Sequence, residues 1–293
     1  MRVFRSPIIL AIRGLLTFLF VFVVVFALIP IPLARWYLSS LAGRQHMHYE
    51  WGWLLALKTA ILFSSLVSTW LMSRIENRPI LGYLRASTGP TLRRFCSGVG
   101  LGAALMAGCI GLIRACHGYE FGTPKISGWE ALGYAAVWIV VATAYGVGDG
   151  IVLFGYPLFT LTRTIGFWGA SVLMSLAFVL LNIVWFDASA IGFVAIFCQG
   201  LFLCATVRRS GDVATAAGLY AGVVFMQDFV FSVSDSGTLY SGHLRNAWFH
   251  GPYWLTGVSA GPKASLMALA VYSVALLLVL FLPQSRGNAP IPD

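Results

Sequence analysis

Eight long stretches of apolar residues, separated by short polar segments, follow one another along the chain. They cover about residues 14–33, 52–73, 96–114, 130–160, 167–186, 189–207, 213–233 and 265–282. A helix needs about 20 mostly apolar residues to cross a bilayer, and a backbone surrounded by lipid must satisfy its own hydrogen bonds. The pattern therefore predicts an all-α protein, a polytopic transmembrane bundle of about eight helices.

The fourth stretch is too long for one straight span. It contains Gly146, Gly148, Gly150 and Gly155, followed by Pro157. Because glycine and proline weaken the helical hydrogen-bond ladder, the sequence predicts a kink or break here.

The first stretch follows Arg2, Arg5 and Arg13, an arrangement that signal peptides also show. Its apolar part, from Gly14 to Pro30, is longer than the hydrophobic region of about 7–15 residues in a signal peptide. We therefore expect a retained first helix.

Composition excludes a soluble or a disordered protein. The chain is 59% hydrophobic and 10% charged, and its mean hydropathy is +0.84. Soluble domains contain about 45–50% apolar and about 25% charged residues, and disordered chains are still more polar. No linker and no repeat divides the sequence, so residues 1–293 are expected to form a single transmembrane domain.

The net charge of +9 is best explained by membrane topology. With the N-terminus inside, twelve basic residues fall on inner segments and six on outer segments, so both termini are predicted to be cytoplasmic. The basic residues follow no nucleic-acid-binding motif, and no nucleic-acid partner is expected. Lys58 lies within the second apolar stretch and is expected to snorkel toward an interface.

Polar side chains inside apolar stretches are costly and are functional candidates for that reason. They are Asp149, Asn182, Gln199, Tyr220, Gln227 and Asp228. Asp149 has two open interpretations: a functional group, or a structural carboxyl that is protonated or bonded to backbone groups near the glycines. Asn182 and Gln199 are expected to hydrogen-bond across helices, and Tyr220 is expected to pack. Gln227 and Asp228 are expected at the membrane interface.

Ordinary hydrolytic sites cannot be assembled from these stretches, because all five histidines lie outside them. His46 and His48 with Glu50 form at most a weak metal-binding pattern. The other three, His117, His243 and His250, are expected to be solvated. No metal site and no cofactor is therefore predicted. The five cysteines, Cys96, Cys109, Cys116, Cys198 and Cys204, contain no CxxC pair and are interpreted as small buried side chains.

Several segments, in order, resemble the CPBP family of membrane proteins, which includes CAAX prenyl endopeptidases and bacteriocin-immunity proteins. The segments are 70–79, 150–156, 175–182, 208–213, 218–222, 225–227, 252–257 and 261–266, and the similar region covers about residues 50–282. The resemblance implies an integral protein of the plasma membrane, the inner membrane of a bacterium.

The chain departs from this family at each position that the family uses for catalysis. The paired glutamates of the family's first motif fall on Asp149 and Gly150, and the arginine of that motif falls on Phe154. The histidine of the second motif falls on Asn182, and the histidine and asparagine of the third motif fall on Tyr220 and Val224. A later glutamate falls on Lys263. In active members the first glutamate and the two histidines are held to activate water. Asp149 is one methylene shorter than glutamate, and an amide cannot replace an imidazole as proton acceptor.

These departures predict a CPBP-like protein without protease activity. We expect its former active-site cavity to bind a peptide, a lipid-linked group or a membrane-protein partner near Asp149, Asn182 and Tyr220, with membrane lipids around it. One alternative is a divergent CAAX-type endopeptidase that uses Asp149 as base. A second is a transporter, since discontinuous helices are common in transporters.

Overall fold

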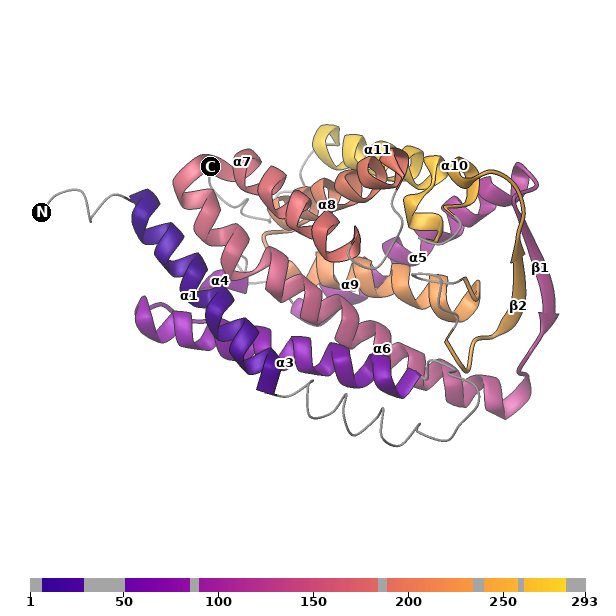
Figure 1. The fold of residues 1–293 in the computed structure, drawn as a ribbon, viewed down its shortest axis with the longest axis horizontal. Coiled ribbons are helices and arrows are strands. Elements are labelled where there is room, and N and C mark those ends of the chain that lie inside the picture. Colours follow the sequence, from indigo (N-terminus) through magenta and orange to yellow (C-terminus); the bar gives the residue numbers. More distant parts are fainter. Residues whose placement is uncertain are drawn as a thin grey trace, which may run out of the picture.

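The computed structural model describes residues 7–28, 51–84, 90–183, 189–233, 240–257 and 261–282. The helices are α1 (Pro7–Leu28), α3 (Trp51–Ile75), α4 (Leu81–Leu84), α5 (Thr91–Ala115), α6 (Gly128–Phe154), α7 (Tyr156–Ile183), α8 (Ala190–Ser210), α9 (Val213–Val224), α10 (Tyr253–Thr256) and α11 (Leu266–Phe281). A π-helical turn, η2 (Phe225–Val230), continues α9, and a 3-10 turn, η4 (Pro262–Ala264), precedes α11. The predicted all-α bundle is confirmed (Figure 1).

The helices are long and apolar enough to cross a membrane. Six helical stretches of the described chain meet this criterion, and one of them, Gly128–Asn182, is 55 residues long and contains both α6 and α7. Helix α11 is shorter but equally apolar. Many large apolar side chains face outward from the bundle, as expected where lipid replaces water. The chain is an integral membrane protein.

The predicted interruption of the fourth apolar stretch is confirmed. Helix α6 ends at Phe154, Gly155 leaves the helical conformation, and α7 begins at Tyr156. A second interruption lies within α7 at Gly166, where φ is 76°, at the boundary that the sequence places between the fourth and fifth apolar stretches. Glycine adopts this left-handed conformation without steric cost, and the helix axis changes direction there.

A tight connection between α8 and α9 follows from its end residues. Gly211 adopts a left-handed conformation with φ of 62° and terminates α8, and its N–H donates to Val207 O at 2.8 Å. The next residue, Asp212, caps α9 by accepting a hydrogen bond from Ala214 N at 2.8 Å. The same carboxylate lies 3.5 Å from Arg94 at the start of α5, so this turn joins three helices at one end of the bundle.

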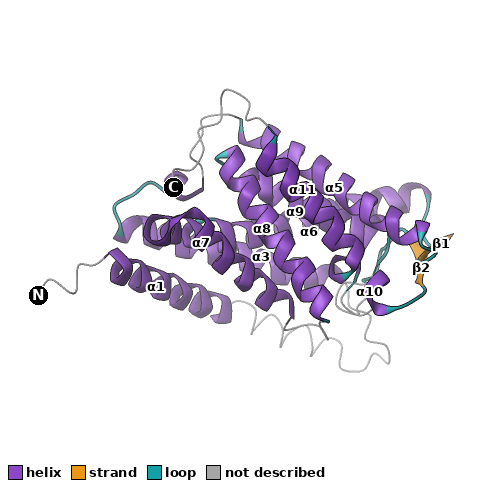
Figure 2. Ribbon diagram, turned by 90° about the horizontal axis from the view of Figure 1, so that it is seen from above, coloured by secondary structure: helices purple, strands orange, loops and turns teal. Residues whose placement is uncertain are grey.

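The other end of the bundle carries a two-stranded antiparallel sheet that the sequence analysis did not predict (Figure 2). Strand β1 (Tyr119–Pro124) pairs with β2 (Arg245–Phe249), and Tyr119 lies opposite Phe249. The Tyr119 side chain is 1% exposed, and its hydroxyl donates to Phe231 O at 2.8 Å. Burial raises the pKa of Tyr119 to about 12, so the hydroxyl remains a hydrogen-bond donor at neutral pH.

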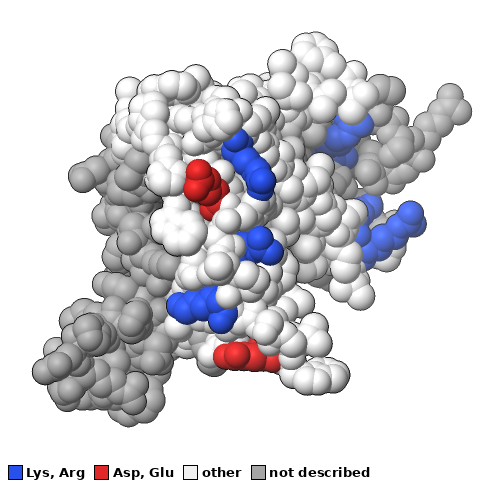
Figure 3. All heavy atoms as spheres, turned by 90° about the vertical axis from the view of Figure 1, so that its right-hand side faces the viewer, with Lys and Arg blue, Asp and Glu red and all other residues white. Residues whose placement is uncertain are grey.

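The two ends of the bundle differ in charge. At the sheet end, basic and acidic side chains are interspersed (Figure 3), and they include Arg114, Glu120, Lys125, Glu130 and Arg245. The opposite end holds many more basic side chains within the described residues: Arg74, Arg78, Arg93, Arg94, Arg163, Arg208 and Arg209, against the carboxylates Glu76 and Asp212. The arginine-rich end is the one that the positive-inside rule would place in the cytoplasm.

Glycines bring α5 and α9 into direct backbone contact. Gly98 and Gly102 of α5 face the backbone of α9, and Gly218 and Gly222 of α9 face the backbone of α5. A Cβ atom added at Gly102 would overlap the carbonyl oxygen of Leu219. Both pairs have the spacing of the GxxxG motif, in which small residues allow membrane helices to approach closely.

Helix α6 approaches α9 in the same way, so α9 is surrounded. A Cβ atom at Gly146 would overlap the carbonyl oxygen of Ala217. Within the stretch Val213–Val230, 72% of the residues are buried inside the bundle, the largest share of any span in the described chain. The centre of the structure is therefore α9, enclosed by α5 and α6.

We expect the Gly102→Ala variant to be destabilised by about 1–3 kcal/mol, because the added methyl group must displace the backbone of α9. Gly108→Ala on the same helix is the matched control. A Cβ atom there meets nothing within 4 Å, and alanine favours a helix more than glycine does. Unfolding in mild detergent measures both variants. Equal stability of the two would show that this glycine contact does not hold the bundle together.

Candidate functional site

Asp149 of α6 forms an ion pair with Lys58 of α3. The Lys58 Nζ atom lies 3.1 Å from Asp149 Oδ2 and 3.4 Å from Oδ1, and the two side chains are 10% and 16% exposed. The same ammonium lies 3.3 Å from the centroid of the Tyr145 ring. The expectation that Lys58 snorkels to an interface is therefore wrong. The nearby carboxylate and aromatic ring stabilise the ammonium inside the bundle more directly than a distant interface would.

The glycines on both sides of Asp149 explain how this ion pair forms. A Cβ atom at Gly148 would lie 3.3 Å from the backbone nitrogen of Leu62 in α3, and one at Gly150 would lie 3.2 Å from the Ala217 side chain in α9. Small residues at both positions therefore allow α3 and α9 to approach α6 at the level of Asp149. Of the two sequence interpretations of Asp149, neither included an ion pair.

Tyr220 lies at the centre of a row of aromatic rings. Its ring centroid is 5.6 Å from that of Tyr145 and 5.6 Å from that of Phe178, and Phe178 is 6.4 Å from Phe154. These residues come from α6, α7 and α9. The sequence expectation that Tyr220 packs within the bundle is confirmed, and Phe154, at the family's arginine position, belongs to the same row.

Asn182 is hydrogen-bonded to Lys263, which lies 81 residues further along the chain. The Lys263 Nζ atom donates to Asn182 Oδ1 at 3.1 Å, and Asn182 Nδ2 donates to Phe178 O at 2.7 Å. The lysine is 4% exposed and belongs to η4. These are two positions at which the sequence departs from the CPBP pattern, and the structure brings them into direct contact.

The sequence-predicted site residues lie on three neighbouring helices. Asp149 is linked to Tyr220 through Lys58 and Tyr145, while Phe154 and Asn182 are each linked to Phe178. Val224 follows Tyr220 by one turn of α9 and is also buried. Contacts therefore run from the Asp149 ion pair through the aromatic rings to Phe178, whose backbone carbonyl accepts from the Asn182 amide. We name this set, with Lys58, Tyr145, Phe178 and Lys263, the inner polar cluster.

The remaining polar residues in the spans have more local roles. Gln199 Nε2 donates to the Tyr272 hydroxyl at 3.1 Å, which confirms the expected bond across helices, here α8 and α11. The expected interfacial position of Gln227 and Asp228 is wrong. Both are buried in η2, where Gln227 Nε2 donates to Asp228 Oδ1 at 3.2 Å. A π-helical turn redirects side chains relative to an α-helix, which periodicity alone does not reveal.

One histidine also departs from expectation. His243 is 2% exposed, and its Nδ1 atom lies 2.6 Å from Tyr240 O. Burial lowers its pKa, which favours the neutral ring. His117 and His250 are exposed as expected, whereas His46, His48 and Glu50 lie outside the described residues. No group of three metal-ligating side chains occurs among the residues that the structure describes.

The cysteines follow the sequence interpretation only in part. Cys109, Cys198 and Cys204 are buried, as expected for small apolar side chains, but Cys96 and Cys116 are exposed. The two exposed cysteines lie near the two ends of α5, where the helix emerges from the bundle. None of the five cysteines forms a disulfide bond.

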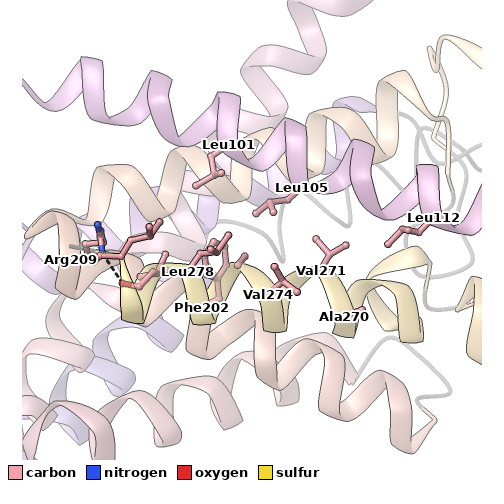
Figure 4. Close-up of a pocket in the computed structure, with 12 residues that line it drawn as sticks. Leu101, Leu105, Leu112, Phe202, Arg209, Ala270, Val271, Val274 and Leu278 are labelled. Atoms are coloured by element: carbon pink, nitrogen blue, oxygen red, sulfur yellow. Dashed lines mark hydrogen bonds between the residues drawn. The ribbon is translucent and has the colours of Figure 1, made fainter. Parts of the chain in front are cut away.

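A pocket of about 460 Å³ lies away from the inner polar cluster, between α5 and α11 (Figure 4). Its walls are almost entirely leucine, valine, alanine and phenylalanine side chains. Arg209 stands at one end, where its Nη1 atom donates to Val279 O at 2.8 Å and to Leu282 O at 2.7 Å and so caps α11. This apolar crevice offers shape but no group for acid–base chemistry, and none of the predicted site residues lines it.

Comparison with known proteins finds no matching family model, no matching curated protein and no matching solved structure. Function must therefore be argued from the geometry of the chain itself.

The inner polar cluster is arranged for stable contact and not for proton transfer. A general base must approach the water that it activates to about 2.6–3.2 Å. The Asp149 carboxyl group is engaged by Lys58 Nζ, which lies 3.1 Å from Oδ2. Asn182 has no titratable proton, and its carbonyl oxygen accepts from Lys263. Each polar group thus satisfies another within the described bundle.

We expect Lys58→Met to lower the free energy of unfolding by about 3 kcal/mol, because the Asp149 carboxylate loses its ion-pair partner inside the bundle. The double variant Lys58→Met with Asp149→Leu removes both charges and is expected to recover most of this loss. Unfolding of the two single variants and the double variant in mild detergent gives the coupling energy. Additive effects of the two substitutions would contradict a direct ion pair.

Proposed function

We propose that the chain is a CPBP-like protein of the bacterial inner membrane that has no protease activity and binds a lipid-linked peptide at the inner polar cluster. The contact between Asn182 and Lys263 carries this proposal. The family resemblance places a histidine and a glutamate at these positions, and here a neutral amide accepts from an ammonium. The water-activating histidine that the resemblance implies is thus replaced by an amide, which cannot take up a proton from water.

The recognition surface is supported by what remains in the cluster. Lys58 and Asp149 form an ion pair within the membrane-spanning bundle, where ionisable side chains are costly and are functional candidates. The aromatic row beside them is buried, and its rings would form the apolar wall against an isoprenoid or acyl group. A few satisfied polar groups beside apolar walls suffice for binding without any chemical step.

The divergent endopeptidase that uses Asp149 as base is the competing function. It requires the carboxylate to leave Lys58 and approach water when substrate is bound. A protease and a binding protein of this kind would bind the same peptide, but only the protease would cleave it. A single peptide probe therefore distinguishes the two functions.

The probe is a fluorescent farnesylated peptide with a CAAX-type C-terminus, added to the full chain in lipid nanodiscs. We expect saturable binding by fluorescence polarisation and an intact peptide by mass spectrometry. Cleavage that disappears in Asp149→Ala would establish the endopeptidase instead. Absence of binding would reject both functions for this class of ligand.

A photo-reactive residue at Val224 is expected to crosslink to the bound farnesylated peptide, because Val224 is buried beside Tyr220 in the cluster. The matched control places the photo-reactive residue at Val274 instead. Val274 lines the apolar crevice between α5 and α11 and is 57% exposed. Mass spectrometry of the crosslinked protein measures both. Crosslinking at Val274 alone would move the binding site to that crevice.

A further inference from the structure

Two arginines from different elements converge on one aromatic ring at the arginine-rich end of the bundle. The Arg163 guanidinium lies 4.6 Å from the centroid of the Phe159 ring, and that of Arg78 lies 6.0 Å from it. Arg163 follows Phe159 by one turn of α7, whereas Arg78 lies in the turn after α3. The fold therefore brings two permanent positive charges together across 85 residues of sequence.

The position of Arg78 is fixed by its backbone. Asn77 adopts a left-handed conformation with φ of 52°, and the N–H of Arg78 donates to Ser73 O at 2.9 Å. This is the Schellman arrangement that ends many helices. The convergence with Arg163 is therefore set by the end of α3, and the two side chains do not meet by chance in a flexible loop.

The nearby carboxylate, Glu76, hydrogen-bonds two tyrosines and attracts Arg163 only from a distance. Glu76 accepts hydrogen bonds from the Tyr156 hydroxyl at 2.6 Å and from the Tyr83 hydroxyl at 2.9 Å. Burial and the bond to Glu76 raise the pKa of Tyr83 far above its usual range, so this hydroxyl remains a donor. In the part of the chain that the structure describes, no carboxylate lies within 4.0 Å of either guanidinium.

An anion between the two guanidiniums would relieve their repulsion. Arginine is suited to phosphate because its planar fork donates two parallel hydrogen bonds. Exposed apolar residues lie close to each arginine in the sequence: Ile75 and Leu81 near Arg78, which are 56% and 64% exposed, and Ile165 near Arg163, which is 45% exposed. A phosphate carried on acyl chains fits this combination better than a free ion does.

We propose that Arg78 and Arg163 form a binding site for the phosphate group of an anionic phospholipid in the leaflet at the arginine-rich end. Anionic lipids of the cytoplasmic leaflet attract basic residues near the membrane surface. This site is separate from the inner polar cluster and does not depend on the function proposed for it.

Native mass spectrometry of the full chain in neutral detergent tests the site, with phosphatidylglycerol, phosphatidylcholine or inorganic phosphate as the added probe. We expect one phosphatidylglycerol to be retained in preference to phosphatidylcholine, and about tenfold weaker retention in Arg78→Gln and in Arg163→Gln. Arg74→Gln is the matched control. Its side chain lies on the same end of α3 but faces Trp70, 5.5 Å from that ring.

Melting temperatures keep the test independent of folding. Without an anion, Arg78→Gln and Arg163→Gln should melt no lower than the parent chain, because each removes one of two like charges. Phosphatidylglycerol should raise the melting temperature of the parent chain and of Arg74→Gln, but not of the other two.

Displacement of the lipid by inorganic phosphate at equal concentration would assign the same site to free phosphate. Equal retention by all three arginine variants, or no preference over phosphatidylcholine, would overturn the proposal.

Discussion

The close backbone approach of α5, α6 and α9 is the constraint on which the rest of the bundle depends. Lipid is as apolar as the helices, so their association gains little from burying apolar side chains and depends on close packing. The glycines of α5 and α6 supply it by leaving room for carbonyl oxygens of α9. Because α9 is held so closely, Tyr220 meets Tyr145 and Phe178, and the inner polar cluster has only one arrangement.

Several polar side chains within this close packing meet in pairs. Lys58 meets Asp149, Lys263 meets Asn182, and Gln199 meets Tyr272, each across two elements. Burying a charge is costly, and a neighbouring charge or hydrogen-bond partner offsets much of that cost. A catalytic site needs a polar group that stays available for water or substrate. The pairing therefore favours recognition over chemistry in the inner polar cluster.

Local patterns in the sequence predicted the helices, but they did not predict the contacts between residues that are far apart in the chain. Apolar length identified the spans, and the glycines before Pro157 located the break at Gly155. The partner of Lys58 lies 91 residues away, and four α-helices and η2 of the described chain separate β1 from β2 in the sequence, so neither contact has a local signal. The GxxxG spacing of Gly98 and Gly102 is visible in the sequence and could have predicted the close contact between α5 and α9.

The arginines at one end of the bundle illustrate the same limit. In the sequence they form one class, positive charges that set orientation. In the structure Arg94 meets a carboxylate, Arg209 caps α11, and Arg208 lies over the rings of Phe167 and Trp168.

Each of these three arginines has contacts that hold it in the fold, whereas Arg78 and Arg163 share a single ring and repel each other. Orientation requires only that the charges lie on the correct side of the membrane. It does not require two of them to converge, so their convergence calls for a separate cause, and an anion of the adjoining leaflet supplies one.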